Sequence, residues 1–262
     1  MRACFREDRH GNQETAFAMN AAVIFAGGSG IRMGSAVPKQ FIEIDGAPIL
    51  AHTLGIFQRH SKIDGIYLVC NPAYRDETEG LVEQFGIKKV RQVVDGGASA
   101  QDSIYNGLKA VERDCPSDTI VVLHDGVRPY LDPLVITANI ESVEIYGNAV
   151  TFTPCFETLV ISKNGEYISD IPYRRESYAA QAPQSFRLGD ILSAHERIRM
   201  MPNGYVDMVD QATICWKLGI PIHLVKGNRG NIKVTTPEDV YMLRALLQCG
   251  KDKSEGRLLY DK

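Results

Sequence analysis

The sequence predicts a three-layer α/β fold built on a mostly parallel sheet. Two observations carry this prediction. Short runs rich in valine and isoleucine are apolar along most of their length, as expected of strands buried on both faces, and amphipathic segments alternate with them along the chain. Alternation of this kind forms right-handed βαβ units, which place helices on both faces of the sheet. Binding sites in such folds lie at the carboxyl ends of the strands.

The strands and helices follow one another in a regular order. The predicted strands of this alternating part occupy residues 21–25, 65–70, 90–94, 119–124 and 148–154. The helices predicted between them occupy residues 48–60, 75–86, 99–114 and 132–147. Ser99 and Asp132 suit N-cap positions, and Pro48 and Pro133 suit first turns. Toward the C-terminus we expect helices near 187–200 and 207–218, a strand at 221–227 and a last helix at 236–248.

Residues 158–181 interrupt this alternation. The segment contains two strand-like runs joined by "KNGE", and Asn-Gly is the strongest short signal for a hairpin turn. An isolated hairpin is marginally stable in water, so we expect it to project from the domain and to pack against another chain. The remaining boundaries are a disordered extension at 1–19, a single domain at 20–250 and a frayed tail at 251–262.

The composition excludes several classes of protein. The 262 residues are 44% hydrophobic, which is enough for a substantial core. A net charge of -3 and the absence of a long basic run give no electrostatic footprint for nucleic acid. The six cysteines form no C-x-x-C pair, which favours reduced thiols in the cytoplasm over a disulfide scaffold or a zinc site. No apolar run is long enough to cross a membrane.

The first predicted strand runs into the glycine-rich stretch "AGGSGIRMG" and then "PKQF". Glycines let backbone N–H groups approach a phosphate closely, and Arg32 and Lys39 would neutralise its charge. The stretch is not a dinucleotide fingerprint, because Met33 occupies the place of the third glycine. It is not a Walker loop either, because Ser35 follows Gly34. The alternative is a tight turn with both cations exposed to solvent.

Two further strand ends carry charged residues. Asp125 directly follows an apolar run, with Arg128 one turn later, and Lys233 lies inside an otherwise uncharged run. A carboxylate at a strand end beside a phosphate loop suits Mg²⁺, although Asp125 and Arg128 could instead form a structural ion pair. We expect Arg32, Lys39, Asp125 and Lys233 to converge at one edge of the sheet, which favours a phosphate-handling site.

The motifs "AGGSGIRMG", "GGASAQDSIYNGL", "HDGVRP", "APQSF" and "NIKVTTPED" occur in the order found in the IspD/TarI family of cytidylyltransferases, which the chain resembles from about residue 20 to 250. The resemblance implies a Rossmann-like nucleotidyltransferase sheet with a protruding β-hairpin arm. It also implies transfer of CMP from CTP to a polyol phosphate with release of pyrophosphate, assisted by Mg²⁺. The acceptor would be ribitol 5-phosphate, giving CDP-ribitol for teichoic acid or capsule, or 2-C-methyl-D-erythritol 4-phosphate of isoprenoid synthesis. The stretch "IPYRRESYAAQAPQSF" and the valine of "GVRP" favour the ribitol branch.

The resemblance also implies residue roles. The backbone along the triphosphate would be that of Ala26, Gly27, Gly28 and Gly30. The neutralising cations would be Arg32, Lys39 and Lys233. The residues beside cytosine and ribose would be Gly96, Gly97 and Ser103. Asp125 would bind the metal. The arm would form a homodimer in which Arg174 reaches the polyol phosphate in the partner's site.

Three positions depart from the family pattern. Ala100 stands where arginine is usual, Gly126 where alanine is usual and Ala182 where threonine is usual. We expect Gly126 to loosen the backbone near the ribose and Ala182 to remove a hydroxyl from the acceptor pocket. Ala100 leaves open a function of another class, a nucleotide-binding regulatory protein without catalysis. The motifs offer no general base, and none is required, because a phosphate monoester with a second pKa of about 6 is already a nucleophilic dianion near neutral pH.

Overall fold

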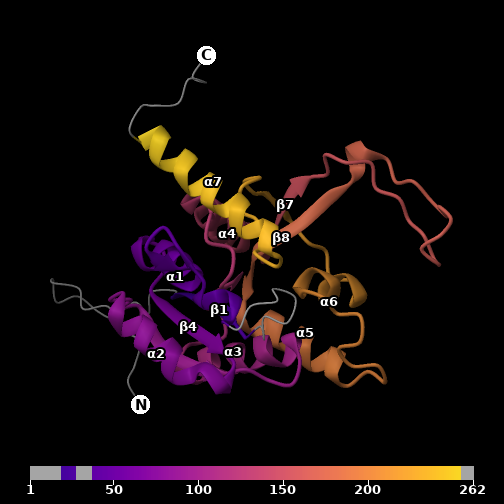
Figure 1. Cartoon of the computed structure of the whole chain (residues 1–262). Coiled ribbons are helices and arrows are strands. Elements are labelled where there is room, and N and C mark those ends of the chain that lie inside the picture. The colour runs from indigo at the N-terminus through magenta and orange to yellow at the C-terminus, as the bar shows by residue number, and fades with distance from the viewer. Residues whose placement is uncertain (1–18, 28–36, 255–262) are drawn as a thin grey trace.

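The structure is a computed structural model that describes residues 19–27 and 37–254, with side chains described as far as residue 250. Its centre is a seven-stranded sheet in the order β5-β4-β1-β6-β8-β7-β9 (Figure 1). The strands are β1 (Asn20–Ala26), β4 (Gly65–Cys70), β5 (Val90–Asp95), β6 (Ile120–Asp125), β7 (Asn148–Pro154), β8 (Tyr178–Arg187) and β9 (Leu224–Lys226). A second, two-stranded antiparallel sheet is formed by β2 (Glu43–Ile44) and β3 (Ala47–Pro48).

Helices cover both faces of the large sheet, as predicted. The helices are α1 (Ile49–Arg59), α2 (Arg75–Gln84), α3 (Ala100–Asp114), α4 (Pro133–Tyr146), α5 (Leu188–Arg199), α6 (Gln211–Lys217) and α7 (Pro237–Ser254). Alternate residues of β1 enter different cores. Val23 packs in the cluster that contains residues of α3, α5 and α6, whereas Ile24 packs with residues of α1, α2 and α4. The central strands β1, β4 and β6 are apolar along most of their length because both of their faces are buried, whereas β5 at the edge of the sheet exposes Arg91 and Gln92.

The predicted helix starts are largely confirmed. The Ser99 hydroxyl accepts a hydrogen bond from the N–H of Asp102 at 3.1 Å, and the Asp132 carboxylate accepts one from the N–H of Leu134 at 2.9 Å. Pro133 is the first residue of α4, as expected. Pro48 differs, because it is the N-cap of α1 rather than a first-turn residue. A proline tolerates both places, since neither needs its N–H.

Both chain ends differ somewhat from the predicted boundaries. Met19, assigned to the disordered extension, is only 7% exposed, and its carbonyl accepts a hydrogen bond from the N–H of Ile120. It therefore belongs to the folded domain, while residues 1–18 lie outside the described residues. Helix α7 continues to Ser254, beyond the start of the predicted tail. Within the described ranges, no helix combines the length and the apolar character needed to cross a membrane.

Strand β8 was not predicted beyond residue 181. It runs antiparallel between β6 and β7, and its sequence contains Pro183, which argues against a central strand. The proline is accommodated by an irregular register, because Val150 pairs with Gln184 whereas Thr151 pairs with Gln181. Pro183 therefore lies in a β-bulge, where the missing N–H costs no ladder hydrogen bond. Its carbonyl still accepts a hydrogen bond from the Thr151 hydroxyl at 2.6 Å.

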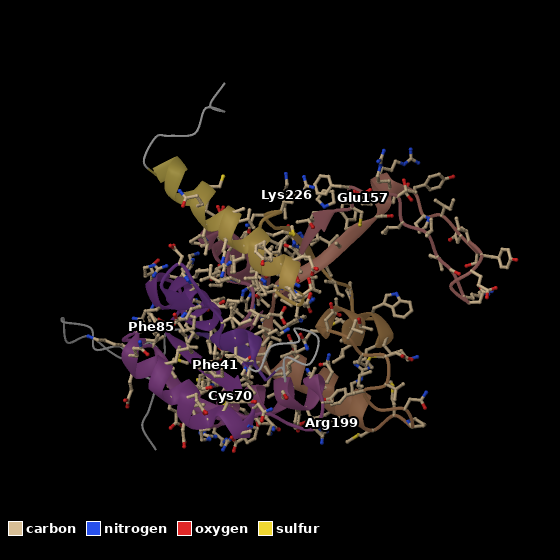
Figure 2. All side chains as sticks on the ribbon, in the orientation of Figure 1. Phe41, Cys70, Phe85, Glu157, Arg199 and Lys226 are labelled. Atoms are coloured by element: carbon tan, nitrogen blue, oxygen red, sulfur yellow. The ribbon has the colours of Figure 1, made fainter. Side chains whose placement is uncertain are left out.

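The predicted arm projects from the body between β7 and β8 (Figure 1). Its turn forms at Asn-Gly as expected, with Gly165 at φ +77° and the Asn164 side chain accepting hydrogen bonds from the N–H groups of Glu166 and Tyr167. The predicted pairing of two strands is reduced to one antiparallel bridge, Ile161 with Asp170. The sticks in Figure 2 show the arm's side chains standing away from the body, so neither face of the arm is covered within this chain. A regular ladder gains little stability without such cover.

Two buried histidines predict how the fold responds to acid. Burial lowers the pKa of both His124 and His195 to about 4. An unfolded histidine titrates near 6.5, so between these values the unfolded chain binds more protons and acid favours unfolding. We expect the free energy of unfolding to fall by about 1.4 kcal/mol per pH unit for each histidine over this range.

Urea denaturation between pH 7 and 4.5 measures this dependence. The His195→Gln variant should show a shallower fall than the wild-type chain, because only His124 of the pair remains. The variant also loses the contact between His195 Nδ1 and the Tyr205 hydroxyl, which are 2.7 Å apart. For this reason the comparison uses the slope of the free energy of unfolding against pH rather than its absolute value. Equal slopes would contradict the assignment to His195.

Candidate active site

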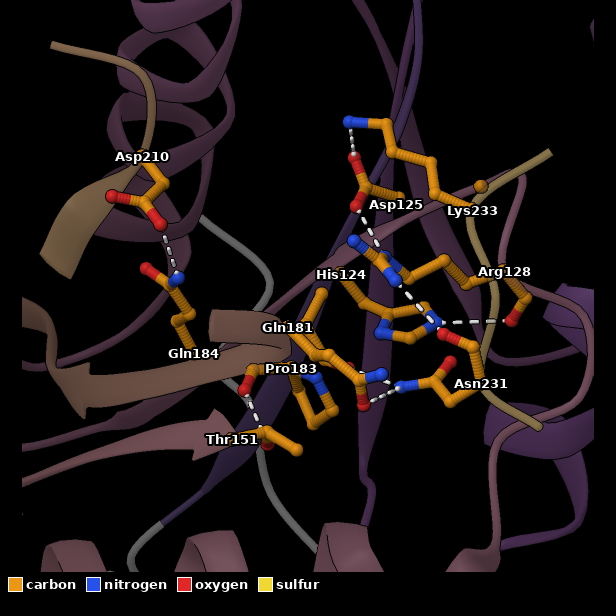
Figure 3. Close-up of polar contacts among 12 residues, drawn as sticks. His124, Asp125, Arg128, Thr151, Gln181, Pro183, Gln184, Asp210, Asn231 and Lys233 are labelled. Carbon is orange, nitrogen blue, oxygen red and sulfur yellow. Dashed lines mark hydrogen bonds and ion pairs between the residues drawn. The ribbon is translucent and has the colours of Figure 1, made fainter. Parts of the chain in front are cut away.

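Three charged side chains meet at the carboxyl end of β6 (Figure 3). Nζ of Lys233 lies 2.8 Å from Oδ1 of Asp125, and Nε of Arg128 donates to Oδ2 of Asp125 at 2.8 Å. The side chain of Asp125 is 22% exposed and that of Lys233 is 43% exposed. The structure thus brings Asp125 and Lys233 together, and it also contains the ion pair of Asp125 with Arg128 that the sequence left as an alternative.

The carboxyl group of Asp125 is held ionised. Burial alone would raise its pKa, but the positive charges of Lys233 and Arg128, together with their hydrogen bonds, outweigh burial and lower the pKa to about 2. One negative charge between two positive charges leaves this strand end positive overall. A site with that balance attracts a polyphosphate.

Main-chain hydrogen bonds fix the segment that carries Lys233 against the turn after β6. The N–H of Val234 donates to the carbonyl of Val127 at 2.9 Å. Nη1 of Arg128 donates to the carbonyl of Asn231 at 2.8 Å. Arg128 therefore contacts both Asp125 and the lysine-bearing segment, which positions the two charges relative to each other.

Asn231 is a site residue that the sequence analysis missed. It is fully buried, and its Nδ2 donates to the carbonyl of Ala182 in the β8 bulge at 2.6 Å. The segment after β9 is thereby tied to β8 as well as to the turn after β6 (Figure 3). The available signal was its place two residues before Lys233, in a run too polar to be an ordinary buried strand.

Lys39 belongs to a segment that packs against the same strand end. It begins a short 3₁₀ helix at Lys39–Phe41. Ile42, three residues later, packs on a small core cluster that contains Val127 and Val234. The segments that carry Lys39, Asp125 and Lys233 therefore share one apolar cluster beneath the site.

The end of β1 lies beside the end of β6. In the parallel pairing of these strands Phe25 is opposite Asp125, so Ala26 and Gly27 continue past the same edge. A Cβ atom added to Gly27 would find no heavy atom of the described residues within 4 Å. The predicted phosphate contacts Gly28, Gly30 and Arg32 lie outside the described residues.

The predicted nucleoside loop is shaped by Ser103. The Ser103 hydroxyl accepts a hydrogen bond from the N–H of Gly97 at 2.9 Å and donates to the carbonyl of Ser99 at 2.9 Å. A Cβ atom added to Gly97 would lie 2.4 Å from the Cβ of Asp102, so this close approach to α3 requires glycine. Gly96 continues from β5, with its N–H donating to the carbonyl of Cys70 at 2.8 Å. The loop therefore has a fixed shape beside the end of β4.

Gly126 does not loosen the backbone, contrary to our expectation. Its N–H donates to the carbonyl of Phe25 at 2.8 Å, and its carbonyl accepts a hydrogen bond from the Thr53 hydroxyl at 2.9 Å. A Cβ atom added here would lie 2.9 Å from the carbonyl oxygen of Phe25. Glycine therefore permits a tight approach between the turn after β6 and β1.

Arg174 lies on the arm, in a short 3₁₀ helix at Arg174–Glu176. Its one hydrogen bond within the described chain is long, from Nη1 to the carbonyl of Phe156 at 3.4 Å. It makes no contact with Asp125 or Lys233.

Asp125 is the candidate ligand for Mg²⁺ among the described residues. Among the described residues, no three histidine, cysteine, aspartate or glutamate side chains come together as a metal cluster. Mg²⁺ in nucleotide sites is commonly held by one or two carboxylates together with substrate phosphates, and Asp125 fits that role. Its Oδ1 is paired with Lys233, whose partly exposed side chain would have to turn toward the substrate.

Comparison with known families agrees with this geometry. The sequence profile described as IspD, 2-C-methyl-D-erythritol 4-phosphate cytidylyltransferase, matches residues 20–249. The chain belongs to the IspD family. The chain is a nucleotidyltransferase, as its cytidylyltransferase relatives and the position of the charged cluster both indicate. Its mostly parallel sheet is the fold of this family.

Individual relatives carry two different names. A ribitol-5-phosphate cytidylyltransferase of Streptococcus agalactiae serotype V is 44% identical over 87% of this chain and 95% of its own length. A 2-C-methyl-D-erythritol 4-phosphate cytidylyltransferase of Geotalea uraniireducens is 38% identical over 87% of this chain and 96% of its own. The solved structure of a 4-diphosphocytidyl-2C-methyl-D-erythritol synthase from Anaerococcus prevotii is similar with a TM-score of 0.75 and 27% identity, over 88% of this chain and 96% of that one.

Proposed function

We propose that this IspD-family enzyme transfers CMP from CTP to ribitol 5-phosphate, releasing pyrophosphate and forming CDP-ribitol. The observation that carries the proposal is the cluster of Asp125, Arg128 and Lys233 at the end of β6, beside the end of β1. The choice of acceptor is supported by the 44% identity to a ribitol-5-phosphate cytidylyltransferase, compared with 38% to a relative named for the other acceptor.

In the proposed reaction a phosphate oxygen of the acceptor attacks the α-phosphorus of CTP. A new P–O bond forms, the bond to the bridging oxygen breaks, and pyrophosphate leaves with its electrons. Catalysis then depends on positioning and charge neutralisation. Lys39 and Lys233 supply positive charge, as would Arg32, while the loop of Gly96, Gly97 and Ser103 receives the nucleoside.

No described side chain near Asp125 is placed as a general base. The nearby His124 is fully buried, and burial holds its pKa at about 4. It lies against the carbonyl of Arg128, at 3.2 Å, and therefore has a positioning role. This agrees with an acceptor that is already a dianion.

Mg²⁺, held by Asp125 and the substrate phosphates, would supply additional charge neutralisation at the phosphoryl groups.

We also propose a cytoplasmic homodimer joined through the 158–181 arm. The described cysteines are all free thiols, which suits a reducing compartment. The arm exposes large apolar side chains, including those of Ile161, Tyr167 and Ile168, which suits burial against a second copy.

The alternative acceptor is 2-C-methyl-D-erythritol 4-phosphate, on the strength of the relatives that bear that name. A regulatory protein without catalysis is disfavoured, because the charged cluster is intact.

The ribitol proposal predicts a clear order of substrates. With CTP, kcat/KM for ribitol 5-phosphate should exceed that for the methylerythritol phosphate by about tenfold or more, since the two differ in chain length and branching.

Release of pyrophosphate from the full chain measures this order. ATP in place of CTP should support little turnover, because the loop of Gly96 and Gly97 is expected to receive a pyrimidine. Faster turnover with the methylerythritol phosphate would transfer the proposal to that acceptor. An absence of turnover with both acceptors would contradict the enzyme function itself.

A further inference from the structure

The segment between β9 and α7 crosses the carboxyl edge of the sheet. It leaves β9 beside β7, where Lys226 is opposite Phe152 and the N–H of Gly227 donates to the carbonyl of Phe152. It then contacts β8 through Asn231 and the turn after β6 through Val234. Residues of this segment thus stand successively over β7, β8 and β6, and end at the charged cluster.

A tight turn holds the first part of this segment. The N–H of Asn231 donates to the carbonyl of Asn228 at 3.1 Å, so Arg229 and Gly230 are the central residues of the turn. The Asn228 side chain donates to the carbonyl of Tyr130 at 2.9 Å and accepts from the N–H of Asp132 at 3.2 Å. The backbone that carries Arg229 is therefore fixed at both ends.

The Arg229 side chain is exposed and has no polar partner among the described residues. Its guanidinium lies over the Phe156 ring, 4.3 Å from the ring centroid. In the described part of the chain it makes no ion pair and donates no hydrogen bond. Stacking occupies the face of a guanidinium and leaves its edge donors available, which is how arginine presents itself to a phosphate.

A second guanidinium group lies near Phe156. Arg174 approaches from the arm to the carbonyl of Phe156, and within the described chain it too forms no ion pair. Arg229 and Lys233 are four residues apart, so their Cα atoms are at most about 14 Å apart, and two long side chains can reach one phosphate between them.

We propose that Arg229 binds the phosphate of the acceptor, in addition to the arm arginine. This inference rests on the proposed function for the identity of the ligand, a phosphate monoester of a small polyol. The acceptor phosphate must lie beside the α-phosphate of CTP, and Arg229 approaches that place along the segment that ends at Lys233. Because Arg229 belongs to the body, it serves the site of its own chain.

The test compares Arg229→Gln with Phe156→Leu in the full chain. Arg229→Gln should raise KM for ribitol 5-phosphate by about tenfold or more, as expected for loss of hydrogen bonds from a charged donor, and leave KM for CTP within about twofold. Arg229→Lys should recover only part of the loss, because lysine lacks the planar fork. Phe156→Leu, which keeps the charge, should have the smaller effect on KM for the acceptor. Equal effects of Arg229→Gln and Phe156→Leu would mean that Arg229 only braces the arm, and would overturn the inference.

Calorimetric titration separates this inference from the proposed acceptor. The wild-type chain should bind ribitol 5-phosphate more tightly than ribitol, and Arg229→Gln should lose most of that difference. If the wild type binds the methylerythritol phosphate instead, the same comparison with that compound and its unphosphorylated polyol tests Arg229 while the ribitol proposal fails. An undiminished preference for the phosphate form in Arg229→Gln overturns the role of Arg229 with either acceptor.

Discussion

Replacing Lys233 with alanine should lower kcat by about 10²–10³-fold, the usual cost of removing one preorganised charge from a transition state. The lysine is held beside Asp125 by the backbone bond from Val234 to Val127, so its charge is already in place when substrate arrives. Steady-state pyrophosphate release with CTP and the acceptor measures the loss. Lys226→Ala, at the end of β9, is a matched control, because it removes an exposed lysine from the same edge of the sheet.

The Lys233 variant should remain folded. Its side chain is partly exposed, and Asp125 keeps its contact with Arg128 after the substitution. Circular dichroism and thermal unfolding would establish this before any kinetic comparison. A folded Lys233→Ala enzyme with near wild-type kcat would show that Lys233 serves only to neutralise Asp125, and the proposed catalytic role would be wrong.

Much of the fold could be predicted because local and tertiary signals agree in it. The strands at 65–70 and 148–154 were located to the residue, since each is a β-branched run closed by polar or turn-forming residues. Strand β8 could not be recognised in this way. Its Pro183 contradicts a central strand unless a bulge is present, and the bulge depends on pairing with β7, which is distant in sequence.

In the candidate site, too, some residues could be predicted from the sequence and others could not. Asp125 could be placed at the carboxyl edge of the sheet, because strand ends of a parallel sheet share one edge. Lys233 was expected at another strand end, but it reaches Asp125 from an irregular segment after β9. Asn231 and Arg229 could not, since their importance arises from the course of one irregular segment over three strands. Asp125 forms a structural ion pair with Arg128 and is still suited to bind a metal ion. The sequence analysis had treated these two roles as alternatives.

The arm leads to a prediction about assembly, which concerns whether Arg174 acts in the site of its own chain or in that of a second chain. Within the described part of the chain Arg174 donates to the carbonyl of Phe156, and the arm's apolar side chains are exposed. A two-fold dimer would bury these side chains and could deliver Arg174 to the other subunit's acceptor site. If Arg174 instead serves its own chain, Arg174 and Lys233 must be intact in the same polypeptide. The two geometries therefore give opposite results when different chains are mixed.

Mixing an Arg174→Ala chain with a Lys233→Ala chain should restore activity. Each homodimer lacks one component at both sites, but a mixed dimer has one site with Lys233 from one chain and Arg174 from the other. At equal proportions half of the dimers are mixed and half of their sites are intact, so about a quarter of wild-type activity should return. Differently tagged chains would establish that exchange has occurred, and Arg175→Ala, which removes the exposed neighbour paired with Glu176, should behave as wild type. Exchange without recovery would place Arg174 in the site of its own chain, and an equilibrium molecular mass of one chain would exclude the dimer altogether.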